Sequence, residues 1–520
     1  MSIPNSTSMG AKRLSTPQII KILWSAAIGF VLIVGVQALL FRLGLPTWLL
    51  ALLWTLITVG SVLILSAMGR TMTSTQFFYS ARRAKASVTG FGGGTDWASG
   101  SFLLLFLLAG PGNQLVFFYA LLLGVLISGI AIAPPFYRSG AATLSGFLTW
   151  RCTSALESRV IALVALACSL TSLAVFMLAE LAVIKAIFAA LFAYDTQMLL
   201  GTLVVLAVLP TVLGGWFSLI AINVVLALWI ILAVTGSTFL FAFMTPPFAP
   251  GMGLQLPTIT GFSDVLSGGL AGGSAMVLVL LLAGGVSVFP HALSRMALLR
   301  KAVAATEHSG WSALFVFVII SSSALSLEFI VGVPTEGTLR LQSQAWISLL
   351  PYFALALASY NALAACIMTF CSVTVRGIQR SRLRSPDDRS MFATRVLALL
   401  VAAVLIMDFD QLTASPVALW LLAVLWLSAT LFVPAVTATW LSGFAPWTML
   451  AMVASGAVLF AALLQPWAMV DLANWDHTFV WFGVMIWAIQ IAVGVLGWFA
   501  ARRYPHLARA DADHIKVLRS

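Results

Sequence analysis

The sequence predicts an all-α polytopic membrane protein with about fourteen transmembrane helices. Of its 520 residues, 61% are hydrophobic and only 8% are charged, whereas a soluble chain carries roughly a quarter charged residues. Apolar runs such as 199–210 and 219–234 hold almost no polar side chain. They lack the apolar/polar alternation of a membrane β-barrel. Because backbone polar groups in lipid must be satisfied within the span, we expect helices.

The expected spans are stretches of mostly apolar residues separated by short polar loops. They cover residues 19–41, 47–69, 89–110, 114–136, 158–182, 196–213, 217–244, 268–290, 310–334, 346–375, 391–408, 415–440, 446–465 and 477–501. Residues 183–195 are apolar but short, and we expect them to extend the fifth span.

The 27 Lys and Arg residues predict the orientation of these spans. A net charge of +11 might indicate nucleic-acid binding, but the charges lie in short loops, where membrane proteins place them. With the N-terminus inside, all but Arg42, Lys185 and Arg340 fall on the cytoplasmic side, including the stretch 295–301. This asymmetry predicts cytoplasmic termini in a plasma or inner membrane, with no nucleic-acid partner and the lipid bilayer as solvent.

The third span breaks the apolar rule with Gly92-Gly93-Gly94-Thr95-Asp96. Each glycine lowers helix stability by roughly 1 kcal/mol relative to alanine, and a carboxylate at membrane depth is costly unless it is solvated or coordinated. An unwound backbone beside a carboxylate is suited to a cation. The alternative is a close helix contact through glycine, with Asp96 capping a frayed end.

A second interrupted span begins with Gly268–Gly273 and continues through Gly284-Gly285 to Pro290. The two interrupted spans stand five spans apart and enter from opposite sides, which is the sequence pointer to a transporter built from inverted repeats. We therefore expect residues 1–88 to hold two extra helices, 89–440 a ten-helix core with repeats 89–244 and 268–440, and 441–520 two more helices and a tail. Gly93, Gly284 and Gly285 are candidate substrate contacts.

Other polar residues in the spans allow several interpretations. The tenth span contains Asn361, Thr369 and Ser372, whose side chains either complete an ion site or bond within their own helix. Glu180 and Lys185 are expected near the outer end of the fifth span, where they pair or reach toward the interface. His291 is interpreted as part of a hinge beside Pro290.

Catalytic patterns are weak. No Cys or His spacing indicates a bound metal, and the close acidic pair Asp408 and Asp410 has no partners. Because the predicted loops hold at most about twenty residues, too few for a soluble domain, we expect no enzyme activity and no cofactor.

Four stretches resemble the sodium/solute symporter family, nearest its acetate and monocarboxylate permease branch. They are Phe77–Arg83, Gly94–Ser99, Thr211–Gly215 and Phe289–Arg295, and they span roughly residues 45–440. The resemblance implies the leucine-transporter-like 5+5 inverted-repeat fold and sodium-coupled uptake by alternating access.

The same resemblance implies an Na⁺ site made of backbone carbonyls of Gly94 and Trp97, with Asp96 beside them. The tenth-span positions of that site fall on Ala358, Asn361 and Ala362, where the family has a Ser/Thr pair. The acid expected after the Gly-Gly turn is Asn223. Both departures remove oxygen ligands or negative charge that a cation would use.

The leading hypothesis is a cation-coupled symporter, with Na⁺ as coupling ion, of a small organic solute such as a monocarboxylate. One alternative is proton coupling. Another is a non-transporting sensor or degenerate family member, motivated by the missing Ser/Thr pair.

Overall fold

The computed structural model describes residues 16–80, 84–150, 155–192, 197–243, 253–254, 272–299, 301–330, 339–340, 349–379, 388–407, 414–440, 446–467 and 477–503. Almost all of them are helical. The first helices are α1 (Thr16–Arg42), α2 (Thr47–Met68), α3 (Ser74–Tyr79), α4 (Ala86–Trp97), α5 (Gly100–Leu108), α6 (Gly110–Ile127), α7 (Ala133–Arg138), α8 (Leu144–Leu148), α9 (Ala155–Leu191), α10 (Gln197–Leu213) and α11 (Trp216–Phe243).

The chain continues with α13 (Gly272–Ser287), α14 (Pro290–Met296), α15 (Val303–Ile330), α16 (Leu349–Gln379), α17 (Asp388–Met407), α18 (Pro416–Leu427), α19 (Val433–Trp440), α20 (Pro446–Trp467) and α21 (His477–Arg503). Two π-helical turns, η2 (Ser128–Ile132) and η4 (Ser428–Phe432), join α6 to α7 and α18 to α19. Strands β1 (Gly253–Leu254) and β2 (Leu339–Arg340) pair antiparallel, with Gly253 opposite Arg340.

The predicted multi-pass membrane architecture is confirmed. Within the described residues, ten helices are long and apolar enough to cross a membrane, and the bent α13–α14 pair adds an eleventh. The two shorter apolar helices lie in α10 and α20, and α4 and α5 form a broken segment. The predicted total of about fourteen spans stays a prediction. Residues 183–191 extend α9, as expected.

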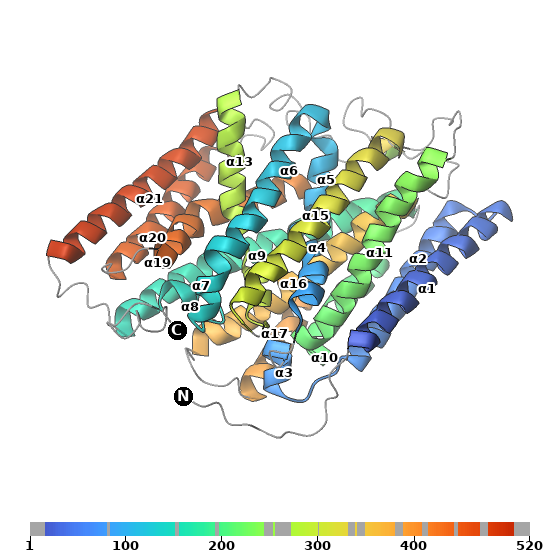
Figure 1. Ribbon diagram of the computed structural model, residues 1–520, viewed down its shortest axis with the longest axis horizontal. Coiled ribbons are helices and arrows are strands. Elements are labelled where there is room, and N and C mark those ends of the chain that lie inside the picture. Colours follow the sequence, from blue (N-terminus) through green and yellow to red (C-terminus); the bar gives the residue numbers. More distant parts are fainter. Residues whose placement is uncertain are drawn as a thin grey trace.

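The helices form one slab, and helices far apart in sequence lie side by side in it, such as α13 and α6 (Figure 1). Helices α1 and α2 lie at one end, and α20 and α21 at the other. Between them, α16 is buried along most of its length and packs against α9, α11, α10 and α17. Helices α4 and α5 pack against α16 as well, α14 contacts both α4 and α16, and α5 and α14 also contact α9.

The turn between α10 and α11 brings two of the motif stretches into contact, the one that begins at Phe77 and the one that ends at Gly215. Gly215 has φ +58°, a left-handed conformation that favours glycine, and a Cβ there would lie 2.6 Å from the carbonyl oxygen of Phe77. Helix α3 therefore docks directly on the Gly-Gly turn. Arg395 of α17 donates to the carbonyls of Thr71 and Leu213 at 2.8 and 3.4 Å, which fixes α17 to the same corner.

Candidate functional site

The third predicted span is broken, but not at its glycines. Helix α4 runs through Gly92–Gly94 to Trp97, and the Gly94 carbonyl accepts the Ala98 N–H at 2.9 Å. Ala98 then leaves the helix with ψ 63°, and Ser99 is extended, its hydroxyl accepting the Phe102 N–H at the start of α5. The expectation that the glycines themselves unwind is wrong.

The glycines serve close packing instead. A Cβ on Gly92 would lie 2.9 Å from Val224, and one on Gly94 would lie 2.4 Å from Phe315. Small residues at helix contacts let backbones approach each other. Helix α4 uses its glycines to pack tightly against α11 and α15, as the alternative interpretation expected. The Asp96 side chain does not cap the helix end but binds Arg295.

The eighth predicted span also breaks. Helices α13 and α14 meet at a 50° bend, with Val288 and Phe289 between them and Pro290 opening α14. Pro290 favours this position because its missing N–H is not needed in a first turn. The bend turns α14 back into the protein, so Arg295 is fully buried. Its predicted place in a cytoplasmic loop is wrong.

Arg295 and Asp96 form a fully buried ion pair between α14 and the end of α4. The guanidinium is bidentate: Nε donates to Oδ2, and Nη2 donates to Oδ1 at 2.7 Å. Trp216 lies 5.4 Å from the guanidinium carbon, which adds a cation–π contact. Taken alone, either charge would be costly at this depth, so each needs the other.

Two asparagines extend this pair into a network. With its amide oxygen facing the guanidinium, Asn223 accepts from Arg295 Nη1 at 2.9 Å and donates to Asn361 Oδ1 at 2.6 Å; the amide orientation follows from these partners. Asn361 in turn donates to the Thr95 hydroxyl at 2.7 Å. Two neutral amide groups therefore lie beside the arginine, at the positions where the resemblance implied an acidic residue and a hydroxyl.

The predicted sodium ligands are brought together, but their chemistry differs from the expectation. The Gly94 carbonyl is used inside α4, and the Asp96 carboxylate is used by Arg295. Ala358 and Ala362 are buried on α16 beside Asn361 and offer no side-chain oxygen. Trp97 ends α4 with its ring against Phe289. A guanidinium thus stands where a coupling cation was expected.

The candidate substrate contacts separate into two groups. Gly93 faces the site, since a Cβ there would lie 3.2 Å from Arg295 Cδ and 3.4 Å from His308. Gly284 faces Trp487, and Gly285 lies against the backbone of Val424. These two glycines pack α13 against neighbouring helices, so their predicted role in substrate binding is not supported by their position.

An aromatic cluster joins the two helix breaks. Trp97 stacks on Phe289 with ring centroids 5.6 Å apart, and Phe176 of α9 contacts Phe289 at 5.1 Å and Trp420 of α18 at 6.4 Å. His291 stacks on Phe289 and bonds the Asp96 carbonyl at 3.1 Å through Nε2. His291 therefore touches both breaks, beyond its predicted role in a hinge.

Several polar atoms of this cluster lack partners. The indole N–H groups of Trp97 and Trp420 are buried donors that make no hydrogen bond within the described structure. His291 Nδ1 is also unpaired there, but it is an acceptor, because Nε2 donates to the Asp96 carbonyl. Buried donors without acceptors are rare in folded proteins and call for an explanation. A bound molecule rich in acceptor oxygens would supply the acceptors.

Glu180 is a buried acid that the sequence interpretation misplaced. It was expected near the outer end of its span, pairing with Lys185 or reaching toward the interface, but it is fully buried, eleven residues before the end of α9 at Leu191. It accepts from the Ser101 hydroxyl and from the Ser101 N–H at 3.2 Å. The signal that could have located it is a lone acid well inside an apolar span, which is a functional pointer in membrane proteins.

A small polar cavity of about 10 Å³ lies on the α3 side of the ion pair. Its walls include Trp216, Ser294, Ser372 and Arg376. Arg376 of α16 donates to the Tyr79 hydroxyl and lies 4.7 Å from that ring. Both residues of the Arg376–Tyr79 contact line this cavity.

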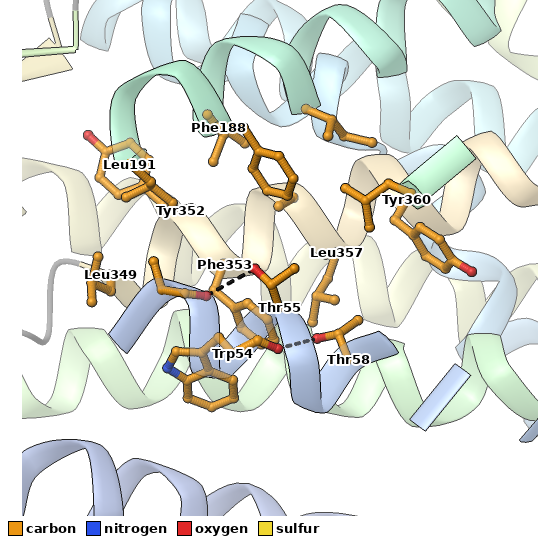
Figure 2. A pocket seen from close by; sticks show the side chains of 15 residues that line it. Trp54, Thr55, Thr58, Phe188, Leu191, Leu349, Tyr352, Phe353, Leu357 and Tyr360 are labelled. Atoms are coloured by element: carbon orange, nitrogen blue, oxygen red, sulfur yellow. Dashed lines mark hydrogen bonds between the residues drawn. The ribbon is translucent and has the colours of Figure 1, made fainter. Parts of the chain in front are cut away.

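A second cavity, of about 50 Å³, is apolar and lies between α2, α9, α10 and α16 (Figure 2). Trp54, Phe188 and Phe353 are among its walls. The hydroxyls of Thr55 and Thr58 point back to carbonyls of their own helix at 2.9 Å, as the dashed lines in Figure 2 mark. No charged residue lines this cavity, so it suits an apolar group and not the polar end of a solute.

Comparison with known proteins supports the fold. No protein-family model matches the sequence, and no curated protein matches it. Among solved structures, a Na⁺-coupled sialic acid symporter in a substrate-bound outward-open state is similar with a TM-score of 0.60 at 13% identity, covering 87% of this chain and 97% of its own. A manganese transporter of Eremococcus coleocola reaches a TM-score of 0.45 at 14% identity, covering 84% and 98% of the two chains.

The chain is therefore a polytopic membrane protein with the fold of a known transporter.

Proposed function

We propose that this protein is a secondary transporter that moves a small organic solute together with a cation by alternating access. The observation that carries the proposal is the meeting of two helix breaks at the Trp97–Phe289 stack, beside the buried Asp96–Arg295 pair. Discontinuous helices at the centre of a bundle are how transporters of this architecture form their binding sites. The likeness to the sialic acid symporter supports the fold in which such a site works.

The helix contacts support two inverted halves, 89–244 and 268–440. Helix α4 packs against α15, and α13 packs against α6; exchanging the halves converts one contact into the other. In the same way, the α9–α18 contact corresponds to the α16–α11 contact. We assign the remaining helices, within 1–88 and 441–520, to the two ends. Membership of the sodium/solute symporter family, cytoplasmic termini and a plasma or inner membrane are part of this proposal.

The solute class follows from the aromatic cluster. Its indole N–H groups are buried donors without acceptors in the described structure, and an ionised carboxylate offers only acceptors. The rings around them suit a short apolar body. We propose a small monocarboxylate as the solute.

Asp96 is not a sodium ligand in this proposal. Its charge is already balanced by Arg295, and a second cation beside a guanidinium meets like-charge repulsion in a low-dielectric site. Uptake is expected to continue when choline replaces Na⁺. Loss of uptake in choline would mean that Na⁺ is the coupling ion and would favour a sodium site near Asp96.

Transport itself is tested by counterflow in proteoliposomes, because exchange of labelled for unlabelled solute needs no ion gradient. Acetate, pyruvate and proline are the probes, and protein-free liposomes are the control. We expect exchange of acetate or pyruvate and not of proline. A folded protein that exchanges none of the three contradicts the proposal. Binding of a probe without exchange would favour the alternative function, a non-transporting sensor. The observation that supports this alternative is the Arg295 guanidinium at the position expected for the coupling cation.

A further inference from the structure

Glu180 lies where three helices meet. It belongs to α9 and reaches the first residues of α5, directly after the break at Ala98. Ser101 supplies both its backbone N–H and its hydroxyl to the carboxyl group. Ser99, whose hydroxyl lies 3.3 Å from that of Ser101, and Ser359 of α16 also face the carboxyl.

Ser359 is the second observation that points to a ligand. Its hydroxyl is fully buried and approaches the Glu180 carboxyl, but it makes no hydrogen bond of normal geometry within the described structure. It is pressed against the start of α5, since a Cβ on Gly100 would lie 1.8 Å from Ser359 Oγ. A proton on the Glu180 carboxyl group would give Ser359 Oγ a donor to accept from.

The carboxyl group has no cation to balance it. In the described part of the chain, no ion pair involves Glu180, and the one nearby guanidinium is bound by Asp96. An isolated carboxylate at this depth is strongly disfavoured by the loss of its hydration. The carboxylate form therefore needs to be neutralised, by a proton or by a metal ion.

The oxygen geometry favours the proton. The Ser101 hydroxyl and N–H both direct hydrogens at the carboxyl oxygens, and the Ser99 oxygen already accepts the Phe102 N–H. A metal ion requires several free oxygen lone pairs, and the carboxyl oxygens and the Ser99 oxygen are already engaged by N–H and O–H donors.

We propose that Glu180 binds the coupling proton of this transporter, with Ser359 as the acceptor of the new carboxyl O–H. This inference rests on the proposed transport function. A proton adds to one carboxyl oxygen, no other bond breaks, and the neutral acid donates to Ser359 Oγ. The bonds from Ser101 then weaken, because they lose a charged acceptor. Proton occupancy therefore changes how firmly α9 holds α5.

Other ionisable groups surround this site from the packed helices. Cys366 lies on α16 within electrostatic reach of both Glu180 and Asp96, and His291 and Arg295 lie on α14, which contacts α9. The Asp96–Arg295 pair carries no net charge. None of these groups supplies a positive charge directly to Glu180, so its own protonation remains the simplest way to neutralise it.

Infrared difference spectroscopy tests the site without any solute. A protonated carboxyl group has a C=O stretch that a carboxylate lacks, so a pH step in purified protein reports the proton directly. We expect a band that Glu180→Gln removes. Glu157→Gln, at an exposed position of the same helix, is the matched control and retains the band. A band unchanged by Glu180→Gln overturns the proposal.

Transport assays then separate the two levels of inference. Glu180→Gln is expected to lose accumulation of acetate or pyruvate driven by an inward proton gradient, and Glu157→Gln is expected to keep it. Full proton-driven accumulation in Glu180→Gln overturns the proton site. Absence of counterflow in the wild-type protein contradicts the transport function, whereas the infrared titration still decides whether Glu180 binds a proton.

Discussion

Arg295 and Asp96, 199 residues apart in sequence, form a bidentate ion pair that is fully buried between α14 and α4. The pair joins the first broken helix of one proposed half to the broken helix of the other. Breaking a buried pair leaves one charge without compensation, which costs about 3–5 kcal/mol. The pair is therefore a strong constraint on the folded state.

Single substitutions of this pair are expected to lower the melting temperature of the purified protein sharply. Asp96→Asn leaves the guanidinium unbalanced, and Arg295→Gln leaves the carboxylate unbalanced. The double variant removes both charges and is expected to recover much of the stability. Additive losses in the double variant would mean that the two residues do not depend on each other.

Arg295→Lys is expected to be nearly as harmful as Arg295→Gln, even though it keeps the charge. A lysine ammonium cannot reproduce the fork that bonds both Asp96 oxygens and Asn223, because it is a compact point charge. Thermal melting in detergent compares the two variants. Wild-type stability in the lysine variant would show that charge alone matters here.

Asn223→Asp is expected to create a sodium dependence that the wild-type protein lacks. The new carboxylate would give Arg295 two acidic neighbours and a net negative charge, which a cation balances. Melting temperatures in NaCl and in choline chloride at equal ionic strength are the measurement, since a bound ion stabilises the folded state. Asn223→Ala is the uncharged control. A sodium shift of equal size in the wild-type protein would contradict our view of Asp96.

Glycine-to-alanine substitutions are expected to have effects that follow the local space. Gly90→Ala places a Cβ 2.3 Å from the His308 carbonyl oxygen, and such overpacking costs about 1–3 kcal/mol. Gly201→Ala in α10 meets nothing within 4 Å and gains about 0.5–1 kcal/mol of helix stability. Melting of the two variants checks both signs. Equal changes in melting temperature for the two variants would contradict the tight packing of α4 against α15.

The contact between Arg376 and Tyr79 is expected to limit access to the small polar cavity. In a variant with the four native cysteines replaced by alanine, Ser294→Cys reports the cavity through labelling by a membrane-impermeant thiol reagent. Adding Arg376→Ala is expected to raise the labelling rate. Ser128→Cys, buried elsewhere on η2, should stay unlabelled in both backgrounds. An unchanged rate at position 294 would exclude Arg376 as the barrier.

The sequence predicted the membrane class and the two broken spans because both depend on local composition. Hydropathy locates apolar segments, and proline and glycine mark interruptions. Asp96 was identified for the same reason, as an acid inside an apolar run. The contact of Asn361 with Thr95 shows that this part of the tenth predicted span lies beside the third, as expected.

Arg295 and Glu180 were misplaced because their positions depend on three-dimensional geometry. Arg295 follows an apolar run and resembles a loop cation, and only the 50° bend returns it to the interior. Glu180 lies in a helix of 37 residues, which at 1.5 Å per residue is roughly 55 Å long and exceeds the bilayer core. Counting from the end of a span of ordinary length puts such a residue too near the surface.

The positive charge that Arg295 holds beside Asp96 has an electrical consequence. In the proposed cycle this charge never leaves the protein, so the only charges that cross with the solute are one proton and one carboxylate, and their sum is zero. A membrane voltage, worth about 2.3 kcal/mol per elementary charge per 100 mV, then has nothing to act on at equilibrium. Accumulation would follow the pH difference alone, and collapsing the voltage with valinomycin and potassium should leave the final solute ratio unchanged.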